Sequence, residues 1–159
     1  MKYERWGIPE EIINKTTTAF TAGRHEVFVI WTAPLEPVEK ICKIKRHIVP
    51  IQRPGSSSWG GVYVHIEGAE LSRIQFDNYD RLERSVVQLH THPSNDVLMS
   101  ALDREWEVVK HVGALSIIVP NYGINDLHNF YGAAVYEREI SDWRLWSHKE
   151  VRRRLRIVK

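Results

Sequence analysis

The spacing of apolar residues predicts a helix near the beginning of the chain, followed by a buried strand. Pro9 suits the first position of that helix, and Gly23 suits the residue that ends it. The helix has one face made of Ile12, Ile13, Thr16 and Phe20. Val27–Trp31 is a continuous β-branched and aromatic run, which is typical of a strand covered on both faces. Glu26 stands at the entrance of this strand.

Alternation and helical spacing predict further strands and helices along the rest of the chain. Strands are expected at Val38–Val49, Gly61–Ile66, Ser85–His90, Ala114–Val119 and Phe130–Tyr136. Helices are expected at Ala69–Tyr79, where Leu71, Ile74 and Phe76 would face partly inward, at Ser100–Val112, which Gly113 would end, and from about His148 to Arg156. The Pro50–Gly61 segment is predicted to be a loop. Because the strands do not alternate strictly with helices, the pattern indicates an α/β or α+β sandwich around one mixed sheet.

Size and composition favour one compact domain over residues 1–159. Hydrophobic residues make up 43% and charged residues 26%, as in ordinary globular proteins. The formal charge of +2 is too small for the basic surface of a nucleic-acid binder. Cys42 is the only cysteine, which fits a reducing compartment, and we assign it no catalytic role. Met1–Gly7 lacks the apolar core of a signal peptide, and no stretch approaches membrane-spanning length, so a cytoplasmic location is expected.

One short stretch carries the pattern of a metal site. His90-Thr91-His92-Pro93 is followed, seven residues after His92, by Ser100 and then by Asp103. Two imidazoles and one carboxylate are a standard ligand set for a catalytic zinc ion, and they leave the fourth position open to water. Residues i and i+2 at the end of a strand point the same way, so both histidines can reach one ion. The whole spacing should arise by chance in only on the order of one in several thousand chains of this length.

Each part of this pattern also has an ordinary structural interpretation. Ser100 and Asp103 fit a capping box at the start of a helix, a role that is compatible with metal binding by Asp103. A lone His-x-His pair on a strand is more often on the surface or hydrogen-bonded. Glu26 is the natural candidate to move protons during hydrolysis, and partial burial should raise its pKa. The alternative for Glu26 is a solvated glutamate at the end of a strand.

These residues resemble the motif of the JAMM, or MPN-plus, zinc metalloproteases. That motif has an upstream Glu, then His-x-His-Pro, seven residues, Ser, two residues and Asp, which His90, His92, Ser100 and Asp103 match without a gap. The resemblance implies that His90, His92 and Asp103 hold one Zn2+ ion and that Ser100 helps to stabilise the oxyanion. It implies that Glu26 is the general base and then the general acid. It further implies a cytidine-deaminase-like MPN sandwich, with a similar order of elements from Pro9 to Tyr136.

The resemblance also implies a class of substrate. Members of this family are mostly isopeptidases that act at the carboxy-terminal tail of ubiquitin or a ubiquitin-like protein, and small bacterial members often accompany ubiquitin-transfer-like (E1- and E2-like) enzymes in antiphage systems. By this resemblance the partner is a ubiquitin-like protein or its conjugate. Charge and hydropathy separately disfavour a nucleic acid and a membrane as partners. The predicted loop Pro50–Gly61 would help to clamp an extended tail, or would be an ordinary surface loop.

Other functions fit the same motif. Maturation of a sulfur-carrier precursor would use the same chemistry, and RadC-like, DNA-associated proteins carry a closely similar His-x-His-Pro motif. A catalytically inactive MPN-type scaffold is the alternative from another class, although intact ligands argue against it. The basic run near the end of the chain is expected to be a solvated helix terminus rather than a nucleic-acid patch; it comprises Arg152, Arg153, Arg154 and Arg156.

Overall fold

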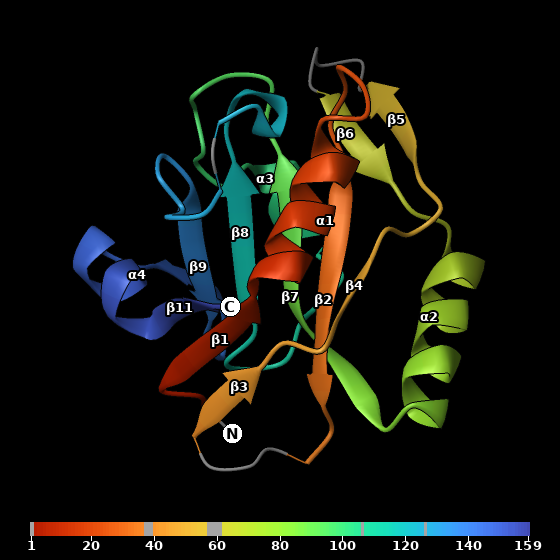
Figure 1. Ribbon diagram of the computed structural model, residues 1–159. Coiled ribbons are helices and arrows are strands. Elements are labelled where there is room, and N and C mark those ends of the chain that lie inside the picture. The colour runs from red at the N-terminus through yellow and green to blue at the C-terminus, as the bar shows by residue number, and fades with distance from the viewer. Residues whose placement is uncertain (1, 37–39, 57–61, 106, 126) are drawn as a thin grey trace.

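The computed structural model describes residues 2–36, 40–56, 62–105, 107–125 and 127–159. At the centre of this part of the chain lies a six-stranded mixed sheet (Figure 1). The order across the sheet is β10-β9-β8-β7-β2-β4. Its strands are β2 (Phe28–Pro34), β4 (Arg46–Ile48), β7 (Glu83–Thr91), β8 (Leu115–Val119), β9 (Ala134–Arg138) and β10 (Trp143–Leu145). Strands β7 and β8 are parallel, and the other neighbours are antiparallel. The predicted mixed sheet is therefore confirmed.

Helices and two smaller sheets surround this sheet. The helices are α1 (Glu10–Phe20), α2 (Gly68–Asp80), α3 (Ala101–Glu105) and α4 (His148–Arg154). A parallel sheet has the order β11-β1-β3, with bounds Leu155–Val158, Arg5–Pro9 and Ile41–Lys43. An antiparallel pair consists of β5 (Arg53–Ser56) and β6 (Val62–His65), and a 3-10 turn spans Asn121–Gly123. Within the described part of the chain, no helix is long and apolar enough to cross a bilayer.

Strand β2 separates the two apolar layers of the molecule. Alternate residues of a strand face opposite sides, so Val29 and Trp31 join the main core with α1, whereas Phe28 and Ile30 pack with Ile74 of α2. Figure 1 shows α1 lying across the sheet and α2 standing at its side, next to β4. The expectation of a strand covered on both faces is confirmed. The same arrangement leaves the carboxyl end of β7 beside the first residues of β2.

The first predicted helix is confirmed almost residue for residue. Helix α1 follows Pro9, and its buried positions are the four predicted ones, namely Ile12, Ile13, Thr16 and Phe20. Glu10 and Glu11 occupy its first turn, where negative charge is favourable beside the exposed N–H groups. The hydroxyl of Thr16 accepts a hydrogen bond from Trp31 Nε1 at 2.9 Å, which attaches the helix to β2.

The predicted strand Val38–Val49 is wrong as a single element. Residues 37–39 lie outside the described part, and the remainder forms β3 and β4, which belong to different sheets. The chain passes from one sheet to the other between Ile44 and Lys45. The N–H of Ile44 donates to Gly7 O at 2.9 Å, and the N–H of Lys45 donates to Thr32 O at 2.8 Å. Alternation of apolar and basic residues cannot reveal such a change, because both halves keep the same period.

The predicted helix Ser100–Val112 is also wrong beyond its first turn. Helix α3 ends at Glu105, and residue 106 lies outside the described part of the chain. The N–H groups of Val108 and Val109 donate to Gln88 Oε1, each at 2.9 Å, instead of to helical carbonyls. A buried side chain on β7 thus replaces the helix as the hydrogen-bond partner of this segment.

Smaller differences concern the ends and faces of elements. Strands β1, β10 and β11 were not predicted, and the final helix stops at Arg154, where β11 begins at once. The predicted loop Pro50–Gly61 contains β5, while residues 57–61 lie outside the described part. The predicted strand Phe130–Tyr136 begins only at Ala134, because Phe130 has a φ of 56° in a turn. Phe76 was expected to face partly inward and is 74% exposed.

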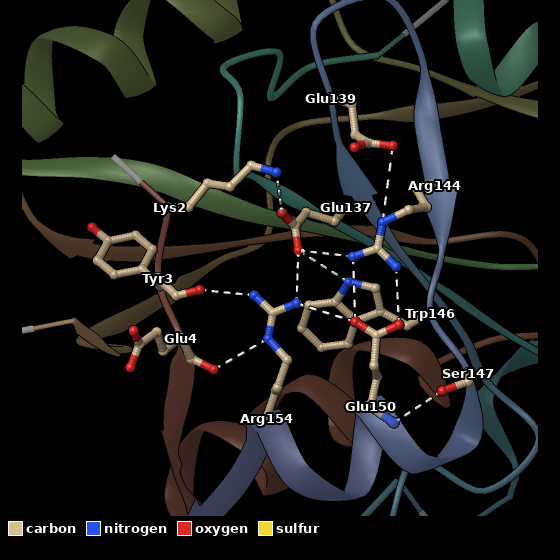
Figure 2. Close-up of polar contacts among 10 residues, drawn as sticks. All are labelled: Lys2, Tyr3, Glu4, Glu137, Glu139, Arg144, Trp146, Ser147, Glu150 and Arg154. Carbon is tan, nitrogen blue, oxygen red and sulfur yellow. Dashed lines mark hydrogen bonds and ion pairs between the residues drawn. The ribbon is translucent and has the colours of Figure 1, made fainter.

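A buried carboxylate ties the last elements to the first residues. Glu137 on β9 is 2% exposed and lies 2.9 Å from Arg154 Nη1, 3.4 Å from Lys2 Nζ and 3.7 Å from Arg144 Nη2. Trp146 Nε1 donates to it at 3.1 Å, and Figure 2 shows these groups converging. The expected solvated basic terminus is therefore wrong for Arg154, whose guanidinium also stacks over the Trp146 ring.

Candidate metal centre

The two histidines of the motif lie at the carboxyl end of β7. His90 pairs with Phe28 across the sheet and is 6% exposed. The Phe28 ring stacks on the imidazole, with 5.9 Å between centroids and 4° between planes. His92 follows the strand, and its N–H donates to Val119 O at 2.8 Å, which continues the pairing with β8. Both imidazoles thus extend from regular backbone and not from a free loop.

Asp103 is positioned by a capping box at the start of α3. The N–H of Ser100 donates to Asp103 Oδ2 at 2.8 Å, and the N–H of Asp103 donates to Ser100 Oγ at 3.0 Å. The predicted capping box is confirmed. Ser100 itself is exposed, and its hydroxyl proton remains available because Oγ serves as an acceptor in this pair.

The three side chains expected to bind metal come together. His90 Nε2 lies 3.1 Å from His92 Nε2 and 3.2 Å from Asp103 Oδ1, and His92 Nε2 lies 3.3 Å from Asp103 Oδ2. One ligand atom from each residue lies within 4.8 Å of the other two. The ligand atoms of a tetrahedral zinc ion, each about 2.0–2.2 Å from the metal, lie about 3.3–3.6 Å from one another. The spacing of the side chains therefore fits a single ion.

The hydrogen bonds around His92 favour a cation between these groups. His92 Nδ1 lies 2.8 Å from Asp96 O, and because a carbonyl only accepts, Nδ1 carries the proton. Nε2 of a neutral His92 then presents a lone pair to a carboxylate and to a second imidazole. Electron pairs facing one another at this distance need a proton or a metal cation between them. The donor set therefore fits a metal ion.

The pKa values of the donors follow from the same contacts. Burial alone would raise the pKa of Asp103, but hydrogen bonds from His90 and His92 in their protonated forms and from the Ser100 N–H outweigh burial and lower it. For His92, burial would lower the pKa, and Asp103 together with the Asp96 carbonyl raises it instead. The carboxylate is thus held ionised, as a metal ligand must be.

His90 departs from the usual environment of a metal ligand. Within the described residues, its buried Nδ1 has no hydrogen-bond partner. Metal-binding histidines commonly donate this N–H to a carboxylate or carbonyl, which fixes the ring. Here the parallel stack on Phe28 fixes the ring orientation in place of that bond.

Glu26 lies at the entrance of β2, as expected, with Val27 between it and the first residue of the strand. It is 7% exposed, and its neighbour Val27 is joined to Thr91 by two hydrogen bonds, from Val27 N–H to Oγ1 at 2.9 Å and from Thr91 N–H to Val27 O at 3.1 Å. Since Thr91 separates the two histidines, these bonds bring Glu26 to the metal centre. Burial raises the pKa of Glu26 to about 7, the positive field of His92 opposes the shift, and Asp103 adds to it.

A small cavity of about 30 Å³ opens beside His90. It is lined by Phe28, Val64, Gln88, His90 and Asp103. This volume holds about one or two water molecules. Gln88 is 2% exposed and was missed at the sequence level, although its place two residues before His90 on one strand face was a usable signal.

The chain is similar to known proteins in sequence and in fold. A protein of Sinorhizobium fredii named probable metalloprotease y4jG is 30% identical over 98 residues, which are 62% of this chain and 58% of that protein. The chain thus spans 58% of the length of this relative. The solution structure of protein DSY2949 from Desulfitobacterium hafniense has a TM-score of 0.65 at 8% identity, over 97% of this chain and 93% of that one, which shows a shared fold alone. No model of a known protein family matches the chain.

Proposed function

We propose that this chain is a JAMM-type zinc metalloprotease that hydrolyses a peptide or isopeptide bond after the carboxy-terminal tail of a ubiquitin-like protein. The observation that carries the proposal is the convergence of His90, His92 and Asp103 at 3.1–3.3 Å, next to the buried carboxyl of Glu26. The similarity to a protein named probable metalloprotease supports peptidase chemistry. The choice of zinc rests on the two-imidazole, one-carboxylate donor set.

In this mechanism His90 Nε2, His92 Nε2 and the Asp103 carboxylate hold the ion. A zinc ion held by these residues would supply Lewis-acid chemistry for a bound water and the scissile carbonyl. Glu26, whose pKa of about 7 leaves comparable amounts of both protonation states at neutral pH, accepts a proton from the attacking water and passes it to the leaving amine. The Ser100 hydroxyl donates to the oxygen on which negative charge develops.

The narrow cavity supports a substrate with small residues at the cleavage site. Phe28 and Val64 border about 30 Å³ of space beside His90 and Asp103, which suits glycine better than a branched side chain. Val64 belongs to β6, so the β5–β6 pair borders the same space. An extended tail that adds a strand here would gain main-chain hydrogen bonds. The proposed clamp in Pro50–Gly61 would include β5.

The biological setting follows from the resemblance and is part of the proposal. We place the enzyme in the cytoplasm, in a bacterial ubiquitin-like conjugation or antiphage system. E1- and E2-like enzymes would supply its substrate. Deconjugation and precursor processing use the same bond cleavage, and both remain within the proposal.

The decisive experiment combines metal analysis with cleavage. The purified chain should contain about one zinc per protein. It should also release a reporter amine joined to a ubiquitin-like protein that ends in Gly-Gly. The Glu26→Gln variant should keep zinc and lose most cleavage, whereas His92→Ala should lose both. Cleavage of unrelated peptides but not of the fusion would reject the substrate class alone. A chain that takes up no metal under any loading condition would reject the enzyme and favour a scaffold, and salt-sensitive DNA binding would favour a RadC-like protein.

A further inference from the structure

The 3-10 turn that follows β8 has three consecutive residues in the left-handed region of backbone conformation. Asn121 and Tyr122 have φ angles of 54° and 55°, and Gly123 has a φ of 75°. Side chains of L-residues make this region unfavourable, and a tyrosine stays in it only where the surrounding structure holds it there. Contacts on two sides hold the turn in this conformation.

On one side the turn lies against the end of α1. A Cβ atom at position 123 would lie 2.7 Å from Phe20 Cβ and 3.1 Å from Phe20 Cγ, closer than side chains approach one another. Phe20 is the last residue of α1 and is 1% exposed, so its Cβ can move aside only if the helix moves. Both the backbone angle and this contact therefore require glycine at position 123.

On its other side the turn donates two hydrogen bonds to the segment that carries His92. The N–H of Tyr122 donates to His92 O at 2.9 Å, and the N–H of Asn121 donates to Ser94 O at 3.0 Å. The N–H of His92 itself donates to Val119 O, at the end of β8. The main chain of residues 92–94 is therefore fixed by β8 and by the turn together.

The same segment supplies the acceptor that orients the His92 imidazole. The N–H of Asp96 donates to Ser94 Oγ at 3.2 Å, and Asp96 O lies 2.8 Å from His92 Nδ1. This contact keeps a proton on Nδ1 and directs Nε2 at Asp103, whose Oδ2 is 3.3 Å away. Removal of a group that orients a metal-binding imidazole in this way typically weakens metal binding by roughly 10–100-fold.

We propose that Gly123 is a positioning residue for the metal ligand His92 and acts through the left-handed turn. Gly123 lets the turn fit against α1, and the N–H groups of the turn hold the segment whose Asp96 carbonyl orients the imidazole. The packing of α1 thereby becomes a determinant of metal affinity. This effect on metal binding rests on the proposed function, whereas the hold on the His92 ring is a property of the metal-free chain as well.

The first test follows the Nδ1–H proton of His92 by NMR in the metal-free chain with 15N-labelled histidine. Its bond to a carbonyl slows exchange with water, so the unmodified chain should give a resolved signal. Gly123→Ala should speed this exchange by about tenfold. Gly132→Ala is the matched control, because Gly132 also has a φ of 75° but an added Cβ would meet only Pro120 Cγ, at an ordinary 3.5 Å. The control should leave the exchange unchanged.

The second test uses Co2+ as the metal probe, because its visible absorption reports the geometry of its ligands. Gly123→Ala should bind Co2+ about tenfold more weakly and with a changed absorption band. Gly132→Ala should match the unmodified chain in affinity and in band. Urea unfolding of both variants measures the loss of stability that any left-handed alanine causes, and such a loss alone moves neither Co2+ readout.

Two results would overturn the role of Gly123. The first is a folded Gly123→Ala variant that keeps the slow proton exchange and the Co2+ affinity of the unmodified chain. The second is an equal change of both properties in Gly132→Ala, which would mean that general destabilisation is the cause. An unmodified chain that takes up no metal would reject the proposed function alone, because proton exchange at His92 still decides the role of Gly123.

A milder pair of variants serves if Gly123→Ala does not fold. Phe20→Leu keeps an apolar side chain but removes the ring that packs on the turn, so it should also speed exchange at His92. Ile13→Leu changes another buried position of α1 and should leave the exchange as it is. Equal exchange rates in these two variants would reject the link between α1 and His92.

Discussion

Ser100 and Asp103 exchange hydrogen bonds with each other's backbone, and the same Asp103 carboxylate faces both histidines. One pair of residues therefore both begins α3 and orients a metal ligand. A substitution at either position changes two properties at once, local folding and the donor set. The expected loss of bound metal is large at Asp103 and small at Ser100, so comparing the two variants separates metal binding from helix capping.

Asp103→Ala should remove most of the bound metal, because two imidazoles alone bind an ion far more weakly than three ligands do. Ser100→Ala should keep most of it, since only the acceptor for the Asp103 N–H is lost, at a cost of about 1 kcal/mol in unfolding free energy. Zinc content measured by atomic emission separates the two. Full occupancy in Asp103→Ala would show that this carboxylate is not a ligand.

Glu26→Gln should change the pH dependence of stability in the metal-free chain. The folded chain raises the Glu26 pKa from 4.5 to about 7, so the folded state binds more protons than the unfolded state between these values. Stability therefore falls as pH rises through this window, by on the order of 1–3 kcal/mol, and the amide variant should lack that fall. Urea unfolding at pH 4.5 and pH 8 measures the difference. If the unfolding free energies of the two proteins change equally between these pH values, the raised pKa of Glu26 is contradicted.

Gln88→Leu should destabilise the chain and weaken metal binding. It leaves the N–H groups of Val108 and Val109 without an acceptor, at a cost of about 1–3 kcal/mol for the buried Val109 group and less for the half-buried Val108 group. Because this segment follows α3, its release should also loosen Asp103. The exposed Gln75 on α2 supplies the control, and Gln75→Leu should stay within about 0.5 kcal/mol. Zinc affinity and urea unfolding of both variants are the measurements.

Glu137→Gln should reduce the unfolding free energy by about 1–3 kcal/mol, because Arg154 would lose its buried counter-charge and keep only the ion pair with Glu150. Glu139 lies in the same group of charges, but 47% of its side chain is exposed and it lies 3.9 Å from Arg144, so Glu139→Gln should cost less than about 1 kcal/mol. Figure 2 shows both carboxylates. Similar unfolding free energies for the two variants would mean that burial of Glu137 does not increase its contribution to stability.

The sequence predicted those features that depend on neighbouring residues. The buried face of α1, the doubly covered β2 and the capping box of Ser100 and Asp103 all follow from local spacing. The meeting of His90, His92 and Asp103 was also anticipated, because i and i+2 positions share a strand face and a short connection leads to Asp103.

Features that depend on distant partners were missed. Helix α3 is cut short because Gln88, twenty residues upstream of Val108, accepts the N–H groups that a longer helix would have used. The division of the predicted strand Val38–Val49 depends on Gly7 and Thr32, which lie on two different sheets. Local periodicity carries no information on such partners.

Strand β1 is flanked on one side by β11, with Trp6 opposite Leu155 in parallel register. A parallel neighbour so far along the chain cannot be recruited early, because loop closure over this separation is entropically slow. On the ribosome, one hydrogen-bonding side of β1 therefore stays unpaired until β11 has emerged. Synthesis of Leu155–Val158 then closes the sheet, so that stalling before these residues would expose an unpaired strand edge to aggregation.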